Sequence, residues 1–355
     1  MTRQNLTRAH EQLFRRDPDE CATDLQALWD HCRRQKEEGR DRWQLPQTIR
    51  PFARDGQILL ELGDDGASLL NDWSFSQLCR IAGVSKDTIN RLSPETAATA
   101  LAETLPRGNR PTQVLTEGDS VRSVHGTHYT RLWNADLLAV VAEFAVDFQP
   151  PPRAYSGGTG LYAGEQDMFA FQIDPAGWAE VEGEAFAPGF FVWNSEVGRR
   201  ALGVSTFWFQ HCCRNHIVWD AVEVTEFTAK HTSRIGDALG EVRRIIEALV
   251  RRRDERRDGF VRVVAKAMKE RLGEDADEVL DRLQTFGVPR GLGSKAVELA
   301  HGQGFTIFSV VDALTRLAQE IPYAGERTEA DQRAARLLDL VSARGEATQT
   351  AALAV

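Results

Sequence analysis

Several histidine and cysteine side chains, which can bind a metal ion, lie close together in the sequence. One group is His125 and His128, a second is His211, Cys212, Cys213 and His216, and His231 follows. Zinc prefers such ligands, but the chain has no C-x-x-C pair, and in a strand His211 and Cys213 share a face that Cys212 does not. Cysteine is also among the most buried residue types. We therefore expect neither a metal nor another cofactor, and the sequence leaves open whether these side chains converge in space.

Two nucleophile arrangements deserve comparison with known catalytic patterns. Cys213 with His125 or His231 would pair a thiol with a base, as nucleophilic catalysis requires. Ser195 is followed by Glu196, but the glycine pattern of a nucleophile elbow is missing. We expect no catalytic residues, and a binding protein is favoured over an enzyme.

Aromatic side chains and cations are interleaved in the central part of the chain. Single-stranded nucleic acids require this chemistry, because every base has a π-face and every phosphate carries a charge. The predicted binding residues are Tyr129, Arg131, Arg199, Arg200, Trp208, Arg214, Lys230 and Arg234. The competing interpretation is that the aromatic rings belong to the core.

The charge of the chain is unevenly distributed. The formal net charge is −9 over 355 residues, yet 16 Lys/Arg face 10 Asp/Glu between Arg199 and Arg271. An acidic protein with a basic segment can still present a local region of positive potential that attracts nucleic acid. No run approaches the roughly 18 apolar residues of a membrane helix. The N-terminus lacks a signal-peptide core, and five cysteines without framework spacing fit a reducing compartment. We expect a cytoplasmic protein without membrane contact.

The strongest strand pattern lies in residues 190–220. Aromatic and β-branched residues predict a hairpin, interrupted by a polar elbow at 194–198 where Gly198 permits a positive φ. In its second run, residues 202–219, both alternating sets of side chains are apolar, which indicates a strand covered on both faces or a strand at an interface. Residues 74–92 have the outline of a helix-turn-helix, with Gly83 at the turn and Ser85 as the cap of the second helix. Two helices packed on a sheet would explain the same pattern.

The chain is predicted to have an α+β fold, with a curved antiparallel sheet, packed helices and a mainly helical C-terminal region. The predicted divisions are a helical arm over 1–47, an α+β core over 48–225, a helical region over 226–341 and a flexible tail over 342–355. Residues 48–63 and the turn at 117–119 indicate strand pairs. Apolar residues from Ile235 to Leu249 are spaced alternately four and three positions apart, which predicts a helix with one apolar face for packing against a helix or a sheet.

Several motifs resemble a family of phage- and plasmid-like proteins, domain of unknown function 932. They are Tyr129-x-Arg131-Leu132-x-Asn134, Asn194-Ser195-Glu196-Val197-Gly198, Cys213-Arg214-Asn215, His231-x-x-Arg234 and the flanking segments Phe75-x-Gln77-Leu78 and Thr306-x-Phe308. The residue after the Cys-x-Asn is His216, where the family usually has glycine. The resemblance implies a mobile-element protein with an α+β domain and a helical C-terminal part, but no activity.

Three functions follow as hypotheses. The first is single-stranded DNA binding or annealing in recombination or replication, by analogy with phage annealing proteins that assemble into homo-oligomers. The second is duplex binding through the helix-turn-helix, with Lys86, Asp87, Asn90 and Arg91 in a major groove. The third is a self-assembling scaffold of a mobile element.

Overall fold

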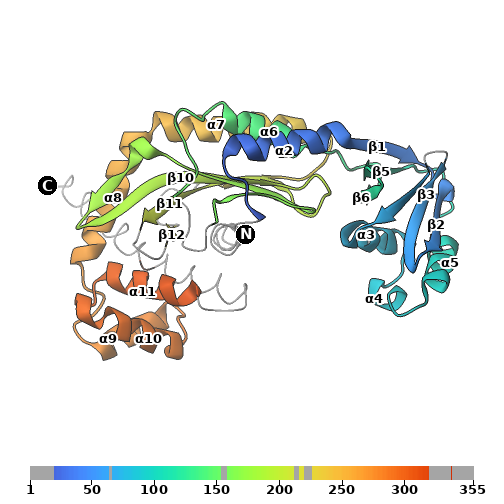
Figure 1. Cartoon of the computed structure of the whole chain (residues 1–355). Coiled ribbons are helices and arrows are strands. Elements are labelled where there is room, and N and C mark those ends of the chain that lie inside the picture. The colour runs from blue at the N-terminus through green and yellow to red at the C-terminus, as the bar shows by residue number, and fades with distance from the viewer. Residues whose placement is uncertain are drawn as a thin grey trace, which may run out of the picture.

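The computed structural model describes residues 20–63, 66–152, 158–211, 216–219, 226–319 and 337. The chain forms two mainly antiparallel sheets with packed helices, followed by a helical C-terminal region, so the predicted α+β class is confirmed. In Figure 1 the first sheet and its helices form a small lobe on the right, and the second sheet and the remaining helices form a large lobe on the left.

The small lobe contains a six-stranded sheet. Its strands lie in the order β1 (Gly39–Gln44), β5 (Thr112–Glu117), β6 (Ser120–His125), β4 (Ala67–Leu70), β3 (Gln57–Leu62), β2 (Ile49–Arg54). Only β4 and β6 are parallel. The predicted strand pairs are β2–β3 and β5–β6, and Gly118 takes a positive φ of 54° in the second turn. β1 and β2 lie at opposite ends of this order although they are close in sequence, where only Leu45 and the short helix η2 (Pro46–Thr48) separate them.

Three helices cover one face of this sheet. They are α3 (Asp72–Ala82), α4 (Lys86–Ile89) and α5 (Pro94–Thr104). Asn71 caps α3 with a capping box, while Ser93 caps α5 ahead of Pro94, which is favoured at a first helical position. Leu78 of α3 and Leu101 of α5 belong to the core of this lobe together with strand residues such as Val124.

The predicted helical arm ends sooner than expected. Helix α2 (Leu25–Glu38) stops at Gly39, and residues 39–44 form β1 in antiparallel register with β5. The helical prediction was wrong here because the short run Arg40–Gln44 is polar except for Trp43 and shows no strand pattern by sequence. Its strand conformation depends on a partner about 75 residues later in the chain, in β5.

The large lobe contains the second sheet. Its main path runs β12 (His216–Trp219), β11 (Leu202–His211), β10 (Glu184–Asn194), β8 (Met168–Ile173), β7 (Leu161–Ala163), while β9 (Ala179–Val181) pairs with β10 and β13 (Glu226–Ala229) pairs with β11. The predicted central hairpin is β10–β11, with register from Ala185↔His211 to Trp193↔Gly203.

Both faces of the hairpin are buried, which is one of the two alternatives that the sequence pattern left open. Phe190 and Val192 belong to the core shared with three helices, α2, α6 (Asn134–Ala142) and α7 (Ile235–Arg251). Phe191 and Trp193 lie on the opposite face in an aromatic cluster that includes Phe207. Trp193 lies over Gly203, where a Cβ would come within 2.0 Å of its ring.

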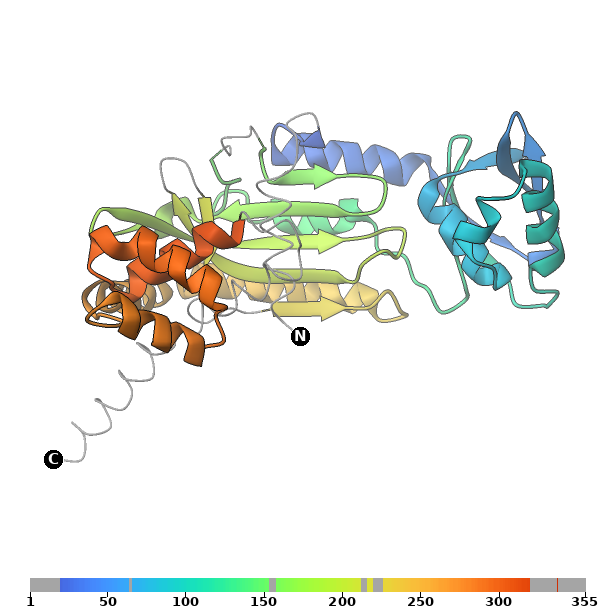
Figure 2. The same cartoon turned by 90° about the horizontal axis from the view of Figure 1, so that it is seen from below.

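The C-terminal helices lie at the end of the large sheet remote from the small lobe, as Figure 2 shows. They are α8 (Arg253–Lys269), α9 (Ala276–Thr285), α10 (Arg290–Ala300), η5 (His301–Gln303) and α11 (Ile307–Gln319). Their core includes Phe260 and Leu314 and reaches the sheet at Phe186 and Trp208. Within the described residues, no helix combines the length and the apolar character needed to cross a membrane.

Candidate functional site

The polar elbow between β10 and β11 lies where the two lobes meet. The Ser195 hydroxyl donates to the carbonyl oxygen of Gln166 over 2.5 Å and accepts from the backbone N–H of Arg199 over 2.8 Å. The indole N–H of Trp73, on α3 of the small lobe, donates to the carbonyl of Val197 over 2.7 Å. The elbow therefore joins the end of the large sheet to a helix of the small lobe.

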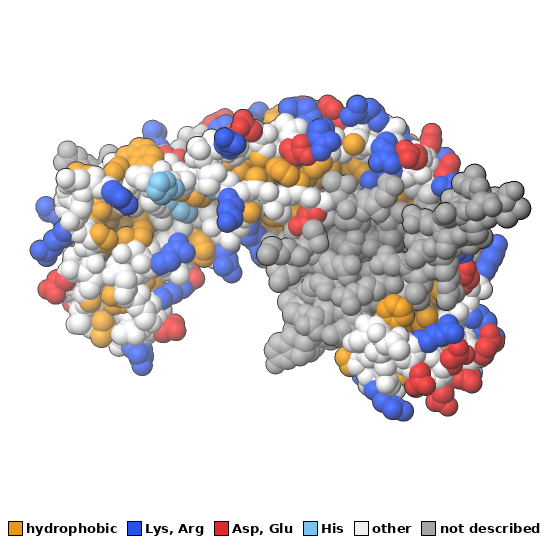
Figure 3. Space-filling model, turned by 180° about the vertical axis from the view of Figure 1, so that it is seen from behind, with side chains coloured by type: hydrophobic (Ala, Val, Ile, Leu, Met, Phe, Trp, Pro, Cys, Tyr) orange, Lys and Arg blue, Asp and Glu red, His pale blue; other side chains and the backbone are white. Residues whose placement is uncertain are grey.

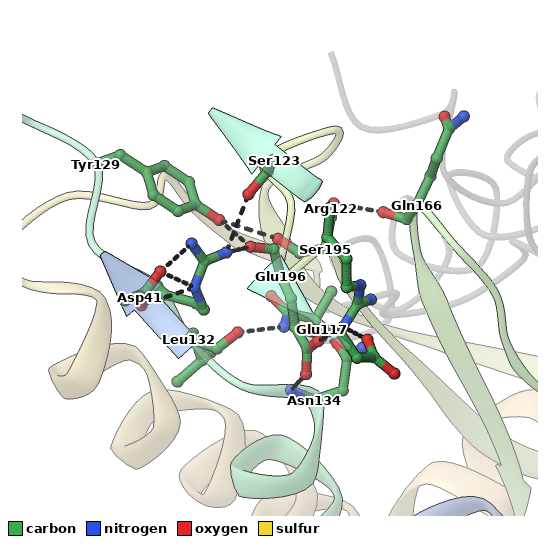
Figure 4. A network of polar contacts seen from close by, with 12 residues as sticks. Asp41, Glu117, Arg122, Ser123, Tyr129, Leu132, Asn134, Gln166, Ser195 and Glu196 are labelled. Carbon is green, nitrogen blue, oxygen red and sulfur yellow. Dashed lines mark hydrogen bonds and ion pairs between the residues drawn. The ribbon is translucent and has the colours of Figure 1, made fainter. Parts of the chain in front are cut away.

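A buried carboxylate forms the centre of this junction (Figure 4). Glu196, 1% exposed, accepts from Nη1 of Arg122 over 3.1 Å and from the backbone N–H of Asn134 over 2.8 Å. Arg122, on β6, also lies 3.0 Å from Glu117. Burial raises the pKa of Glu196, while Arg122, the Asn134 N–H and Arg131 oppose that shift. The Glu196 carboxylate is bonded to groups of the protein itself, and it links the elbow to β6 and to the start of α6.

Two motifs far apart in the sequence meet at this junction. The Asn194 amide donates to the carbonyl of Leu132 and to the side-chain oxygen of Asn134, each over 2.9 Å. Arg131 donates to the carbonyl of Glu196, and its guanidinium lies 2.6 Å from Asp41 on β1. The 129–134 segment and the 194–198 elbow are therefore one interlocked structure.

Three aromatic rings stack beside the elbow. His125 and Tyr129 are parallel with ring centroids 3.7 Å apart, and His231 follows at 5.3 Å from Tyr129. The Tyr129 hydroxyl donates to the carbonyl of Glu196 over 2.7 Å. Burial lowers the pKa of His125 to about 3 and that of His231 to about 4, and it raises the pKa of Tyr129. All three rings are uncharged near neutral pH.

The segments that carry or contact the stacked rings also carry exposed cations. Arg199 follows the elbow, Lys230 follows β13, Arg234 precedes α7, and Arg80 lies on α3 near His125. β13 pairs with β11, and the Thr130 N–H donates to the carbonyl of His231, which brings the 230–234 loop to the elbow. We call these four cations the junction surface. Figure 3 shows Lys and Arg side chains spread over both lobes, some of them near the place where the small lobe joins the large one.

The junction surface differs from the neighbouring charges in having no ion pair with the described part of the chain. Arg199 lies over the ring of Trp73, with its guanidinium carbon 5.2 Å from the ring centroid. Trp73 itself is half-buried. Cation and aromatic face are thus adjacent and reach solvent together.

Other predicted binding residues are already engaged. Arg131 is paired with Asp41 and has a side chain only 3% exposed, and Arg200 is paired with Asp167 over 2.5 Å. The Trp208 prediction was wrong, because its ring is 1% exposed and stacks on Phe260 of α8, with centroids 3.9 Å apart. Tyr129 is enclosed between two histidines and offers no open face for a base. Arg214, Cys213 and Asn215 lie outside the described residues.

The predicted helix-turn-helix forms two helices joined by Gly83, which takes a left-handed conformation with φ 69°. Ser85 caps the second helix as expected. However, this helix, α4, is one turn long, and Lys86 is held 2.5 Å from Asp72. α3 packs against the sheet and contributes Leu78 and Cys79 to the core. The segment therefore has the structure of the alternative explanation of this pattern, two helices packed on a sheet.

The arrangement offers little for covalent chemistry. Ser195 is buried, and its hydroxyl contacts backbone groups instead of a base. In the part of the chain that the structure describes, no three His, Cys, Asp or Glu side chains are grouped to hold a metal ion. Cys212 lies outside that part, as do the side chains of His211 and His216.

Sequence reasoning missed several residues of the junction. Arg122 and Asp41 hold it together, Trp73 supports Arg199, and Arg80 adds a cation. One signal was present: Arg122 is a lone charge between the apolar residues Val121 and Val124 of a strand, where an unpaired charge would be costly. The pairing of Asp41 depends on the tertiary structure.

No protein family, curated protein or solved structure matches this chain. The resemblance to domain of unknown function 932 therefore stays a prediction.

Proposed function

We propose that the chain binds single-stranded nucleic acid at the junction surface. The observation that carries the proposal is that three segments with exposed cations meet at the ring stack: the elbow with Arg199, the loop before α7 with Lys230 and Arg234, and α3 with Arg80. Phosphate groups are the partners that such unpaired cations favour, because binding releases the counterions condensed on the strand.

The contrast with neighbouring arginines supports this choice. Arg131 and Arg200 form ion pairs with Asp41 and Asp167. The cations of the junction surface have none of the described carboxylates within 4 Å. In a chain with net charge −9, such a grouping provides local attraction for a polyanion.

A single strand suits the surface better than a duplex. The junction surface is built from a turn, a loop and the end of a helix, and it presents no recognition helix to a groove. Trp73, half-buried beneath Arg199, supplies one place where a base can stack next to a cation, after a small shift of the arginine. Sequence-independent binding follows, because every base has a π-face.

A narrower form of the proposal assigns the chain to strand annealing during recombination or replication on a mobile element. It rests on the motif resemblance and on the analogy with annealing proteins. It predicts that several copies assemble on one strand, which mass measurement with and without an oligonucleotide would detect.

The test is a fluorescence anisotropy titration against a labelled single strand and the matching duplex. With three of the four cations in contact with phosphates, raising the salt from about 50 mM to about 200 mM should weaken single-strand binding roughly twentyfold. The triple variant Arg199→Ala, Lys230→Ala, Arg234→Ala should lose most of the affinity at low salt. Undetectable binding by the unaltered chain at low salt would remove the proposal.

A matched control separates local binding from net charge. Arg262, Arg290 and Lys295 are exposed on α8 and α10 and make no ion pair with the described residues. Replacing these three by alanine changes the net charge equally, and this variant should keep single-strand affinity within about twofold of the unaltered chain. Equal losses in both triple variants would mean that the attraction is not located at the junction surface.

A further inference from the structure

A second candidate binding site lies on the small lobe. A pocket of about 370 Å³ opens between the connection from β1 to β2 and the loop that follows α5. The residues that matter in its lining are Gln47, Ile49, Arg50, Leu105, Arg107 and Asn109. Its volume falls within the range of small-molecule sites.

The charges that line this pocket are all positive. Arg50 and Arg107 contribute two guanidinium groups, and the described lining includes no carboxylate. The carboxylate nearest to Arg50 is Glu61 at 4.0 Å, in a pair whose arginine side chain is 75% exposed. Arg107 is exposed and makes no ion pair with the described part of the chain. Two guanidinium groups match the charge of a dianion.

The rest of the lining suits the organic part of such an anion. Ile49 and Leu105, 4% and 6% exposed, give the pocket an apolar floor. The amides of Gln47 and Asn109 supply donors and acceptors at its sides. An apolar floor combined with a few polar groups is typical of small-molecule sites.

The helix end beside the pocket, the C-terminus of α5, opposes an anion less than it would with all of its last carbonyl groups free. Free carbonyl groups at a helix C-terminus repel negative charge, but here the Thr104 hydroxyl donates to the carbonyl of Ala100 over 2.6 Å and to that of Leu101 over 3.3 Å. The Leu105 N–H also donates to Leu101. Of the last four carbonyl groups of α5, those of residues 101–104, these contacts occupy that of Leu101.

We infer that this pocket binds a phosphate monoester attached to a flat or apolar group. Arginine forks bind phosphate oxygens in a bidentate manner, and a monoester carries close to two negative charges near neutral pH, which a carboxylate does not. A nucleoside 5′-monophosphate has this chemistry, either free or as the 5′ end of a strand. The inference is independent of the junction surface.

Calorimetric titration with adenosine 5′-monophosphate tests the inference. Arg50→Ala and Arg107→Ala should each weaken binding about tenfold or more, as expected for the loss of a charged hydrogen-bonding partner. Arg54→Ala is the matched control, because Arg54 is an exposed arginine of the same strand outside the pocket lining, and it should leave the affinity unchanged. No binding by the unaltered chain, or equal affinity in the pocket variants, would overturn the inference.

Two oligonucleotides distinguish the sources of the phosphate. They differ only in a 5′-phosphate or a 5′-hydroxyl end and are titrated against the junction triple variant, so that failure of the proposed function does not affect the result. Preference for the phosphorylated end, lost in Arg107→Ala, would assign the pocket to strand ends. Binding of the free nucleotide without that preference would assign it to a small-molecule ligand.

Discussion

The carboxylate of Glu196 lies 3.1 Å from Nη1 of Arg122, and both side chains are buried between the lobes. The pair connects the elbow of the large sheet to β6 of the small one. A third member, Glu117, lies 3.0 Å from the same nitrogen of Arg122. Because two carboxylates share one guanidinium, loss of Arg122 would leave more uncompensated charge than loss of either acid.

Removing one partner of this pair should therefore destabilise the fold strongly. We expect Glu196→Ala or Arg122→Ala to lower the free energy of unfolding by about 3–5 kcal/mol, and the double variant by less than the sum. Urea denaturation measures these changes. As a control, Glu143→Ala removes the partner of Arg243 in a pair about half-exposed and should cost less than about 1 kcal/mol. Additive losses in the double variant would contradict direct coupling.

Acid should weaken the junction through two histidines, the half-buried His125 and the buried His231. Their pKa values are about 3 for His125 and about 4 for His231 in the fold, below the ordinary 6.5, because burial disfavours the charged form. The unfolded chain then binds more protons, so their stabilisation is complete above pH 6.5 and is lost as the pH falls toward 4. Each histidine should cost about 2 kcal/mol between pH 8 and pH 5.

The measurement is the free energy of unfolding at several pH values. His125→Phe keeps a ring beside Tyr129 but cannot titrate, so its stability should fall less steeply over this interval than that of the unaltered chain. Glu196, with its raised pKa, opposes the trend equally in both proteins and cancels in the comparison. His128→Asn, at an exposed position, should keep the original slope. An unchanged slope in His125→Phe would contradict the burial argument.

Gly198 should tolerate no side chain. Its φ is 71°, and a Cβ would lie 2.5 Å from Cε1 of His125 and 3.0 Å from Tyr129. Gly198→Ala should therefore lose about 2–4 kcal/mol, from the left-handed backbone and from displacement of the stacked rings. Gly240→Ala is the control, because no heavy atom lies within 4 Å of its Cβ position inside α7. That variant should gain about 0.5–1 kcal/mol, measured by the same denaturation.

Substitution of Trp208 should lower the free energy of unfolding without changing the affinity for nucleic acid. Its ring stacks on Phe260 in the core between the large sheet and α8. Trp208→Ala should lower the free energy of unfolding by about 3–5 kcal/mol, and Trp208→Phe should cost less. Anisotropy titration of the folded Trp208→Phe variant should give the affinity of the unaltered chain. A specific loss of single-strand binding in that variant would restore Trp208 as a contact residue.

Local patterns predicted the elements well. The β10–β11 hairpin follows from aromatic and β-branched residues around a polar elbow with Gly198, and α5 follows from Ser93-Pro94 before an alanine-rich run. The turn at Gly83 and the cap at Ser85 likewise depend on residues close in sequence. By itself the sequence determined these features, because their conformations depend mainly on neighbours within a few positions.

The tertiary structure decided which polar and aromatic groups are available. Arg131 and Arg200 look like Arg199 in the sequence, but carboxylates on distant segments, Asp41 and Asp167, pair with the first two and not with the third. Trp208 is covered by α8, which no strand pattern predicts. Burial and pairing depend on contacts between segments tens to hundreds of residues apart, so only the folded chain separates the free cations from the engaged ones.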